Sequence, residues 1–368
     1  MRLNKLTISA WRSYDSARAA FDPGINLILG ENAQGKTNLL EAIYYLSTGR
    51  SFRTRSQGEL IRQGKEYAEL QAAVTSQDRE QSLRVVLFQG RRRRILEKNG
   101  VRQKSWAETG DLIHAVLFCP EDLLILRSGA SGRRRLLDDA LCQLRPAYDT
   151  ALTEYGRLQE QKARILKDWR ETPNLLELLP DYNTRMAQVG AILISHRARY
   201  VRALDQCAAG YHAELSGGRE TLHLEYRTVS AVTDPFVSQA ELYEILLRQF
   251  ELRRSAELET GLCLTGPHKD DFSACLGDLA VKSYASQGQT RTAAISLKLA
   301  ERELCRRDTG QEPILLLDDV LSELDTARQD YVLNRLGSGQ VFITCCEEKR
   351  LSGLGRQFFI QDGTIQCL

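Results

Sequence analysis

Residues 30–37 have the residue types and the spacing of a phosphate-binding loop, G-x-x-x-x-G-K-[ST]. In order, they are Gly30, Glu31, Asn32, Ala33, Gln34, Gly35, Lys36 and Thr37. The glycines let backbone N–H groups surround phosphates, and the positive end of the helix that follows adds to the attraction. Lys36 is expected to reach the β- and γ-phosphates of ATP, and Thr37 to bind Mg²⁺ through its hydroxyl oxygen.

A pair of acids follows the apolar run 314–317 in the last third of the chain. Four consecutive apolar residues are typical of a strand buried in a parallel sheet, and α/β sheets bind ligands at the carboxyl ends of their strands. Asp318 is expected to hold Mg²⁺, and Asp319 to orient the attacking water or accept its proton. Acids that merely cap a helix would give the same local pattern, but the phosphate-binding loop favours catalysis. The predicted catalytic residues are Lys36, Asp318 and Asp319.

A third motif begins 32 residues before Asp318 and opens a predicted helix over 290–307. It consists of Ser286, Gln287, Gly288 and Gln289. A serine and a glycine at the start of a helix can bind an anion, although an isolated tetrapeptide of this kind is more often an ordinary N-cap turn. The order of phosphate-binding loop, signature and acidic strand is the one that ABC-type ATPases share. In that class the signature contacts nucleotide held by the other subunit.

The elements that must position these motifs divide the chain into strand-rich ends and a helical middle. Alternating or apolar runs predict strands over 2–9, 25–29, 69–74 and 83–88, and helical periodicity runs from about residue 121 to 211. A strand over 222–226 and a helix over 239–252 follow. This pattern predicts an α/β fold in which both termini build lobe I, an ATPase head over 1–122 and 303–368. The inserted lobe II, residues 123–302, is expected to be mostly helical and to end with the signature.

Composition excludes several other classes of protein. The 368 residues are 42% hydrophobic and 27% charged, which excludes long disorder and a fibrous repeat. No apolar run approaches the roughly 18 residues of a membrane span, and residues 1–21 carry charges throughout, unlike a signal peptide. A cytoplasmic protein without a membrane partner is therefore predicted.

The basic residues are unevenly distributed, although the net charge is only +2. Of the 50 Lys and Arg residues 39 are Arg, and the segment 84–104 has eight basic residues and one acidic residue. Arginine suits bidentate phosphate contacts. The candidate DNA-binding residues are Arg91, Arg92, Arg93, Arg94, Arg133 and Arg134. Residues 91–94 could instead be a solvated hairpin end, and residues 133–135 could instead pack a helix at the domain boundary. His268 could either contact nucleotide or cap a turn.

Several stretches together resemble the RecF family, which is related to the heads of SMC proteins. Residues 11–14 (WRSY) resemble the early FRNY element of the family, and residues 118–123 (FCPEDL) resemble its F-x-PEDL. Residues 133–138 resemble RR-x-x-LD, and residues 265–271 (TGPHKDD) resemble GPHRDD with lysine for arginine. The signature region 284–292 and the acidic region 317–325 are close to the family forms. The resemblance covers essentially the whole chain, with one departure, QKA at 161–163 where the family tends to have QRN.

The resemblance implies roles that the spacing alone does not supply. Arg12 would contact ATP, Ser322 and Asp325 would form the D-loop near a dimer interface, and Thr344 would be the switch residue. No obvious Q-loop glutamine is present, and residues 118–121 are a candidate replacement. The protein would be a weak, DNA-stimulated ATPase used as a switch, and it would form a homodimer on ATP. It would bind single- and double-stranded DNA at gaps or junctions and, with RecO and RecR, promote RecA loading, supporting replication forks and SOS induction in the cytoplasm, at the nucleoid.

Three other functions fit these motifs less well. An ABC transporter subunit would need a membrane partner and a clear Q-loop glutamine. An SMC-type structural ATPase would need hundreds of heptad residues between the motifs. A DNA-binding module with an inactive nucleotide site is opposed by the intact Lys36, Thr37, Asp318 and Asp319.

Overall fold

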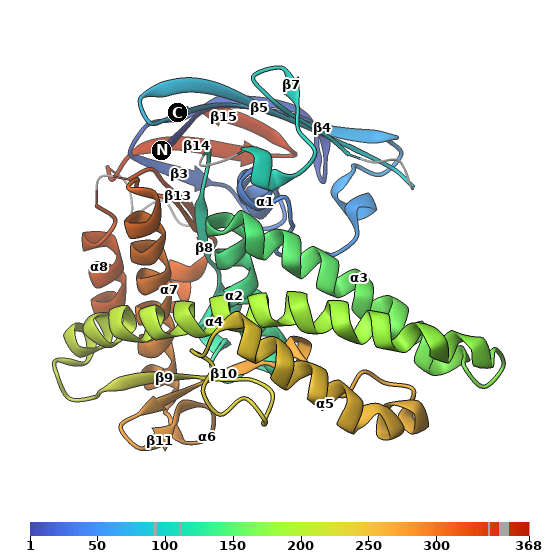
Figure 1. Ribbon diagram of the computed structural model, residues 1–368. Coiled ribbons are helices and arrows are strands. Elements are labelled where there is room, and N and C mark those ends of the chain that lie inside the picture. Colours follow the sequence, from blue (N-terminus) through green and yellow to red (C-terminus); the bar gives the residue numbers. More distant parts are fainter. Residues whose placement is uncertain (91–93, 110–111, 338, 346–352, 368) are drawn as a thin grey trace. The chain divides into compact units, whose positions relative to one another are not determined.

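The computed structural model describes residues 1–90, 94–109, 112–337, 339–345 and 353–367. They form two compact units (Figure 1). Unit 1 comprises Met1–Leu124 and Arg291–Leu368, and unit 2 is Ile125–Thr290. The sequence placed the boundaries after residues 122 and 302. The second division falls earlier, inside helix α7 (Gln287–Thr309), so that most of α7 belongs to unit 1. A continuous helix gives no sequence signal at such a point.

The first sheet of unit 1 is antiparallel, with the strand order β2-β1-β4-β5-β6-β7. Apolar and polar residues alternate along β1 and β4, so one face of each strand is buried. The bounds are β1 (Arg2–Trp11), β2 (Tyr14–Ala20), β4 (Tyr67–Ser76), β5 (Arg79–Phe88), β6 (Ile95–Lys98) and β7 (Val101–Arg102).

The second sheet of unit 1 has the order β15-β14-β3-β13-β12-β8 and is parallel except for the β14–β15 pair. Its central strands are mostly apolar and almost fully buried, as expected for strands covered on both faces. The bounds are β3 (Ile25–Leu29), β8 (Ala115–Phe118), β12 (Ile314–Leu317), β13 (Val341–Cys345), β14 (Arg356–Gln361) and β15 (Thr364–Cys367).

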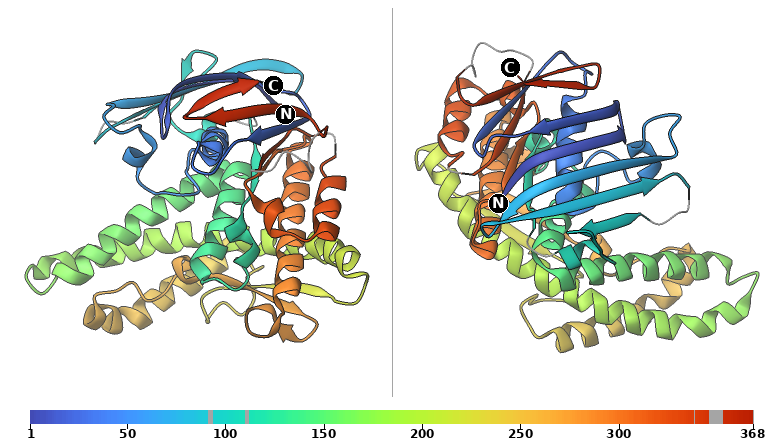
Figure 2. Two further views of the ribbon diagram at one scale, coloured as in Figure 1. Left: turned by 180° about the vertical axis from the view of Figure 1, so that it is seen from behind. Right: turned by 90° about the horizontal axis from the view of Figure 1, so that it is seen from above.

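Helix α1 (Lys36–Thr48) lies between these two sheets, in contact with β4 of the first and with β8 and β13 of the second (Figures 1 and 2). Its side chains are apolar on most of its circumference, and Leu39, Leu40 and Ile43 are fully buried. The other helical segments of unit 1, besides the C-terminal part of α7, are α8 (Thr326–Asn334), η1 (Gln57–Leu60), η2 (Trp106–Thr109), η3 (Pro120–Leu124) and η6 (Val320–Glu323).

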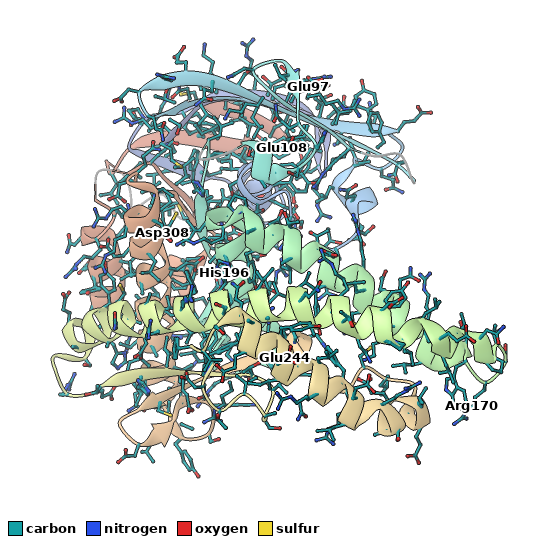
Figure 3. All side chains as sticks on the ribbon, in the orientation of Figure 1. Glu97, Glu108, Arg170, His196, Glu244 and Asp308 are labelled. Carbon is teal, nitrogen blue, oxygen red and sulfur yellow. The ribbon has the colours of Figure 1, made fainter. Side chains whose placement is uncertain are left out.

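Unit 2 is built on long helices that run side by side, with a small sheet of order β11-β10-β9 against α4 (Figure 1). Proline stands in the first turn of α3 and of α4, where its missing N–H costs nothing. Figure 3 shows Arg170 at the end of the hairpin that α3 and α4 form. The bounds are α2 (Ala130–Leu144), α3 (Pro146–Asp168), η4 (Pro173–Leu178), α4 (Leu179–Ser216), β9 (Leu222–Arg227), α5 (Gln239–Thr260), η5 (Pro267–Lys269), β10 (Asp271–Leu276), β11 (Leu279–Ala280) and α6 (Val281–Tyr284).

Each predicted strand and helix has a counterpart in the structure. The sequence predicted no range for the other strands, which are β2, β6, β7, β8, β10, β11, β13, β14 and β15. Among the described residues, no helix is both long and apolar enough to cross a membrane.

Candidate nucleotide site

The phosphate-binding loop connects the end of β3 to the start of α1, and its two glycines occupy positions that other residues cannot. Gly30 has φ +146°, and a Cβ there would lie 2.4 Å from the backbone oxygen of Ile360. Gly35 has φ +116°, and its carbonyl accepts a hydrogen bond of 3.0 Å from the Tyr14 hydroxyl. Only glycine tolerates this backbone so close to its neighbours.

The predicted ATP-binding residues lie along this loop. Residues 31–33 are exposed at its apex, and the Lys36 side chain passes beneath it, 4% exposed. The Lys36 ammonium donates hydrogen bonds to the carbonyls of Gly30 (2.7 Å) and Glu31 (3.0 Å). Gln34 accepts one of 2.7 Å from the backbone N–H of Asp362, in the β14–β15 turn. The loop is therefore supported from within and from the C-terminal hairpin.

The acids after β12 meet Thr37, although they are far away in the sequence. The Thr37 hydroxyl donates a hydrogen bond of 3.0 Å to Asp318 Oδ1. The buried hydroxyl of Thr344, on the adjacent strand β13, donates one of 3.0 Å to the same oxygen and accepts one of 2.8 Å from the Asp319 N–H. Asp319 is in the left-handed region, with φ +50°. The structure thus brings together Thr37, Asp318, Asp319 and Thr344.

Burial raises the pKa of Asp318 above its usual value, while the hydroxyls of Thr344 and Thr37 oppose that rise by stabilising the carboxylate. The charge of Asp319 raises the pKa further, and that of Arg53 lowers it. A hydroxyl oxygen and a carboxylate oxygen 3.0 Å apart are the kind of ligands that Mg²⁺ binds in phosphate sites. The residues present therefore fit this ion.

Arg12, the other predicted ATP contact, is fixed by a fully buried carboxylate that the sequence did not single out. Its Nε and Nη2 donate to the two oxygens of Glu41, each at 2.8 Å, and Nη1 donates to the Glu59 carbonyl at 2.8 Å. Glu41 also accepts a hydrogen bond of 2.5 Å from Ser51. In the sequence, Glu41 is one polar residue of a predicted amphipathic helix. Nothing local marks it as special, because its partners come from other segments of the chain.

An open cleft of about 580 Å³ lies beside Arg12 in unit 1. Polar side chains dominate its lining, and two of them are arginines. The lining residues are Arg12, Ser13, Asn38, Arg53, Gly58, Glu59, Ile61, Gln63, Gly64 and Gln89. The cleft shares Asn38 with the first turn of α1, so it begins where the phosphate-binding loop ends.

The predicted signature residues lie in unit 2, at and before the start of α7. Ser286 is exposed and forms a capping box: its hydroxyl accepts from the Gln289 N–H (3.2 Å), and Gln289 Oε1 accepts from the Ser286 N–H (2.7 Å). Gln287 is the first residue of α7, followed by Gly288. The ordinary N-cap role is thus present, and the contact with nucleotide on another subunit stays a prediction.

The predicted D-loop and Q-loop segments flank the acidic strand. Ser322 donates to the Asp319 carbonyl (2.6 Å), and Asp325 caps α8 by accepting from the Arg328 N–H (3.1 Å). Phe118, at the end of β8, accepts the backbone N–H of Asp318 (3.0 Å). Residues 118–121 therefore begin next to the acids, and their role as a Q-loop stays a prediction.

The predicted DNA-binding arginines differ in placement. Arg91, Arg92 and Arg93 lie outside the described residues. Arg94 donates to the Gly49 carbonyl (3.2 Å), and its guanidinium lies over the Trp106 ring.

Arg133 is 4% exposed and forms a bidentate ion pair with Asp271, at 2.7 and 2.8 Å. This burial does not fit the expected DNA contact: its guanidinium joins α2 to the start of β10. Arg134, which is half-buried, donates to the Asp270 carbonyl (2.7 Å), and its DNA-binding role stays a prediction.

His268 occupies a hydrogen-bonded position within unit 2. Its Nε2 donates to the Cys263 carbonyl (3.0 Å), so its Nδ1 accepts from the Tyr155 hydroxyl (2.9 Å). These contacts favour the structural alternative over a nucleotide contact. The neighbouring Asp270 is fully buried and pairs with Arg197 at 2.9 Å.

Comparisons with known proteins agree with this geometry. The family model described as RecF/RecN/SMC N terminal domain matches residues 2–362. The DNA replication and repair protein RecF of Symbiobacterium thermophilum is 40% identical over 350 residues, which cover 94% of this chain and 92% of that protein. A solved structure of the recombination mediator protein RecF with ATP, in the RecFOR pathway, is 33% identical, with a TM-score of 0.91 and 100% and 97% of the two chains covered.

An Smc head domain from Pyrococcus furiosus, 17% identical, shares the fold, with a TM-score of 0.55 over 100% of this chain and 95% of that one. The predicted fold class, an α/β ABC-type ATPase head with a helical insertion, is therefore confirmed. The chain belongs to the RecF family of DNA replication and repair proteins, ABC-type ATPases related to the heads of SMC proteins.

Proposed function

We propose that the protein is an ATP-dependent DNA-binding protein of recombinational repair. It binds ATP with Mg²⁺, forms a homodimer in that state and hydrolyses ATP slowly to end it. It binds DNA at single-strand gaps or junctions and, with RecO and RecR, promotes RecA loading, which supports replication forks and SOS induction. We expect it in the cytoplasm, at the nucleoid.

The observation that carries this proposal is the meeting of Thr37, Asp318 and Thr344 at one carboxylate oxygen. A P-loop protein that had lost its ATPase function would have no reason to keep a buried acid here, because burying a carboxylate costs free energy unless hydrogen bonds offset it. The two hydroxyls keep Asp318 available as an anion. Asp319, whose N–H is held by Thr344, then orients the water that attacks the γ-phosphate.

Mg²⁺ would be held by Thr37 and Asp318, and when bound it neutralises charge on the β- and γ-phosphates. Lys36 contributes from the other side, because its ammonium already lies among the loop carbonyls, within reach of phosphates bound on the backbone N–H groups. The sugar and base lie in the cleft that begins at Asn38, with Arg12 in its wall.

Dimerisation is supported by the exposure of Ser286 at the start of α7. The order of motifs in ABC-type ATPases implies that the anion bound at this helix start is the phosphate of a nucleotide held by the phosphate-binding loop of the other subunit. Each monomer would therefore bind ATP alone and hydrolyse it only when a second subunit completes the site.

Sedimentation and turnover of one variant test the proposal. Asp319→Asn removes the carboxylate that orients water but leaves Asp318, so ATP should bind, turnover should fall, and the ATP-bound dimer should persist on DNA. The wild type should show a dimer only with ATP and faster turnover with DNA. A wild type that stays monomeric with ATP and DNA, without turnover, would instead support a DNA-binding module with an inactive nucleotide site.

A further inference from the structure

The side chain of Gln289 links the predicted signature to a part of unit 2 that the proposed function does not use. Its Oε1 accepts the backbone N–H of Ser286 at 2.7 Å, and its Nε2 donates a hydrogen bond of 2.7 Å to Glu220 Oε1. Glu220 lies between α4 and β9, 69 positions before Gln289 in the sequence. The predicted signature is therefore bonded to a carboxylate from a remote segment of the same unit.

Glu220 determines which way the amide of Gln289 points. A carboxylate only accepts hydrogen bonds, so the amide nitrogen must face Glu220, and the amide oxygen is left to accept the N–H of Ser286. Without Glu220, either end of the amide could face Ser286, and the nitrogen end would place two donors against each other. The carboxylate thus selects the one orientation that closes the capping box.

Glu220 is itself fixed by a histidine near the C-terminal end of α4. His212 is fully buried, and its Nε2 lies 3.2 Å from Glu220 Oε2, the carboxylate oxygen that does not bind Gln289. Burial lowers the pKa of His212, although the hydrogen bond with Glu220 opposes this shift. The neutral ring therefore donates its Nε2–H to the carboxylate and holds it from the buried side.

The backbone around Ser286 is fixed as well. Arg127 donates a hydrogen bond to the carbonyl of Ala285, the residue before the serine. The N–H and the hydroxyl of Thr290 donate to the carbonyl of Ser286, at 3.0 and 2.8 Å. A hydroxyl that accepts one hydrogen bond, as Ser286 does from the Gln289 N–H, can still donate its proton to a phosphate oxygen. A donor held in this way loses little conformational entropy when the two subunits meet.

We propose that Glu220, anchored by His212, is a positioning residue of the predicted signature. Through Gln289 it holds the Ser286 hydroxyl in the orientation that meets the γ-phosphate bound to the other subunit. This inference rests on the proposed function, since it assumes that the signature acts in trans. Because Glu220 acts through Gln289 and not on the nucleotide itself, its loss should lower dimerisation and turnover and leave the binding of ATP to each monomer unchanged.

Three measurements on the full chain test this role. They are isothermal titration with Mg-ATP at protein concentrations below dimerisation, sedimentation with ATP, and DNA-dependent turnover at saturating ATP. Glu220→Ala should lower turnover about 10- to 100-fold and weaken the ATP-dependent dimer, with the ATP affinity of the monomer within about twofold of the wild type. The matched control is Glu225→Ala, the same change at an exposed carboxylate of β9 that pairs with Arg227 on its own strand, and all three measurements should stay within about twofold.

A double-mutant cycle separates positioning from a general structural role. Gln289→Ala removes the link to Ser286, so the addition of Glu220→Ala should cause little further loss of turnover. Losses that multiply in the double variant, or equal turnover in Glu220→Ala and Glu225→Ala, would overturn the proposal.

Melting of each variant checks folding. If Glu220→Ala is unstable, Glu220→Gln takes its place in the same cycle, because a side-chain amide can donate as well as accept and no longer selects the orientation of Gln289. Failure of the proposed function would look different, because Ser286→Arg and Gln289→Ala would both hydrolyse ATP normally, or the wild type would not dimerise with ATP.

Discussion

At the scale of single residues, the site depends on polar groups whose charge state is set by what buries them. Asp318 is the clearest example: burial raises its pKa, and the hydroxyls of Thr37 and Thr344 work against the rise. His268 shows the opposite sign, because burial lowers the pKa of a cation to about 4. The two shifts in pKa therefore predict how turnover and stability should depend on pH.

Thr344→Val removes one hydroxyl and keeps the shape of the side chain. Asp318 loses a hydrogen bond to its carboxylate, and the N–H of Asp319 loses its acceptor. We expect ATP turnover to fall about tenfold or more, with ATP affinity nearly unchanged. The acid limb of the turnover–pH profile should move to higher pH, because the pKa of Asp318 rises further. Thr344→Ser keeps the hydroxyl and should retain most activity; a serine variant as slow as the valine variant would contradict this role.

His268→Gln should weaken the pH dependence of stability between about pH 4 and 6.5. The folded pKa of His268 (about 4) lies below its ordinary value of 6.5, so the unfolded chain binds more protons in that window and stability falls as pH falls. Stability is unaffected by this group above pH 6.5, and the loss of stability reaches about 3 kcal/mol by pH 4. Urea unfolding of both proteins at several pH values measures it, and parallel curves would refute it.

At the scale of elements, the phosphate-binding loop depends on close contacts with strands that are remote in sequence. The backbone of β14 blocks any side chain at Gly30, and the β14–β15 turn holds Gln34. The C-terminal hairpin is therefore part of the support of the loop, and the loop cannot be treated as a segment of local structure only.

Gly30→Ala tests that support. The added Cβ would meet the Ile360 carbonyl at 2.4 Å in a left-handed conformation, so we expect a loss of about 3 kcal/mol in the free energy of unfolding and loss of ATP binding. Gly310→Ala is the matched control in unit 1: its φ is +69° with open space around it, so it should cost only about 1 kcal/mol. Equal losses in thermal or urea unfolding would mean that contact with β14 does not matter.

At the scale of the whole molecule, the candidate residues for one catalytic cycle are divided between the two units. Unit 1 contains the loop, the acids and the cleft, whereas Ser286, the exposed serine of the predicted signature, belongs to unit 2. In a homodimer in which each predicted signature contacts the nucleotide of the partner subunit, the residues of both units would take part in one site. The proposed DNA-binding, RecR and RecO interactions belong to this scale as well.

Mixing two inactive variants tests the shared site. Ser286→Arg puts a bulky cation at the interface and should block dimerisation while each monomer still binds ATP; Lys36→Met should lose ATP binding. A mixed dimer would contain one composite site with Lys36 from one chain and Ser286 from the other. Recovery of part of the wild-type turnover in the mixture supports a site in trans.

Ser286→Ala is the control for the helix cap, and it should cost about 1 kcal/mol in stability with a milder loss of turnover. Normal DNA-dependent turnover by Ser286→Arg alone would rule out the signature assignment.

The sequence by itself determined the elements whose signals are local. An apolar run predicted β3 with its observed ends, and the glycine spacing, the lysine and the helical periodicity after it placed the loop and α1. The four apolar residues before Asp318 likewise predicted β12. These signals are readable because hydrophobic periodicity and glycine conformation depend on neighbours in the chain.

Only the tertiary structure decided which polar side chains serve the site. Thr37 and Asp318 are 281 positions apart, and Gln34 and Asp362 are 328 apart, so no local pattern could pair them. Arg53, which no sequence pattern singled out, lies in the cleft, whereas Arg133 was a predicted DNA contact and is buried against Asp271. The sequence gives the charge of an arginine. Its exposure and its hydrogen-bond partner depend on which remote segments the fold brings next to it.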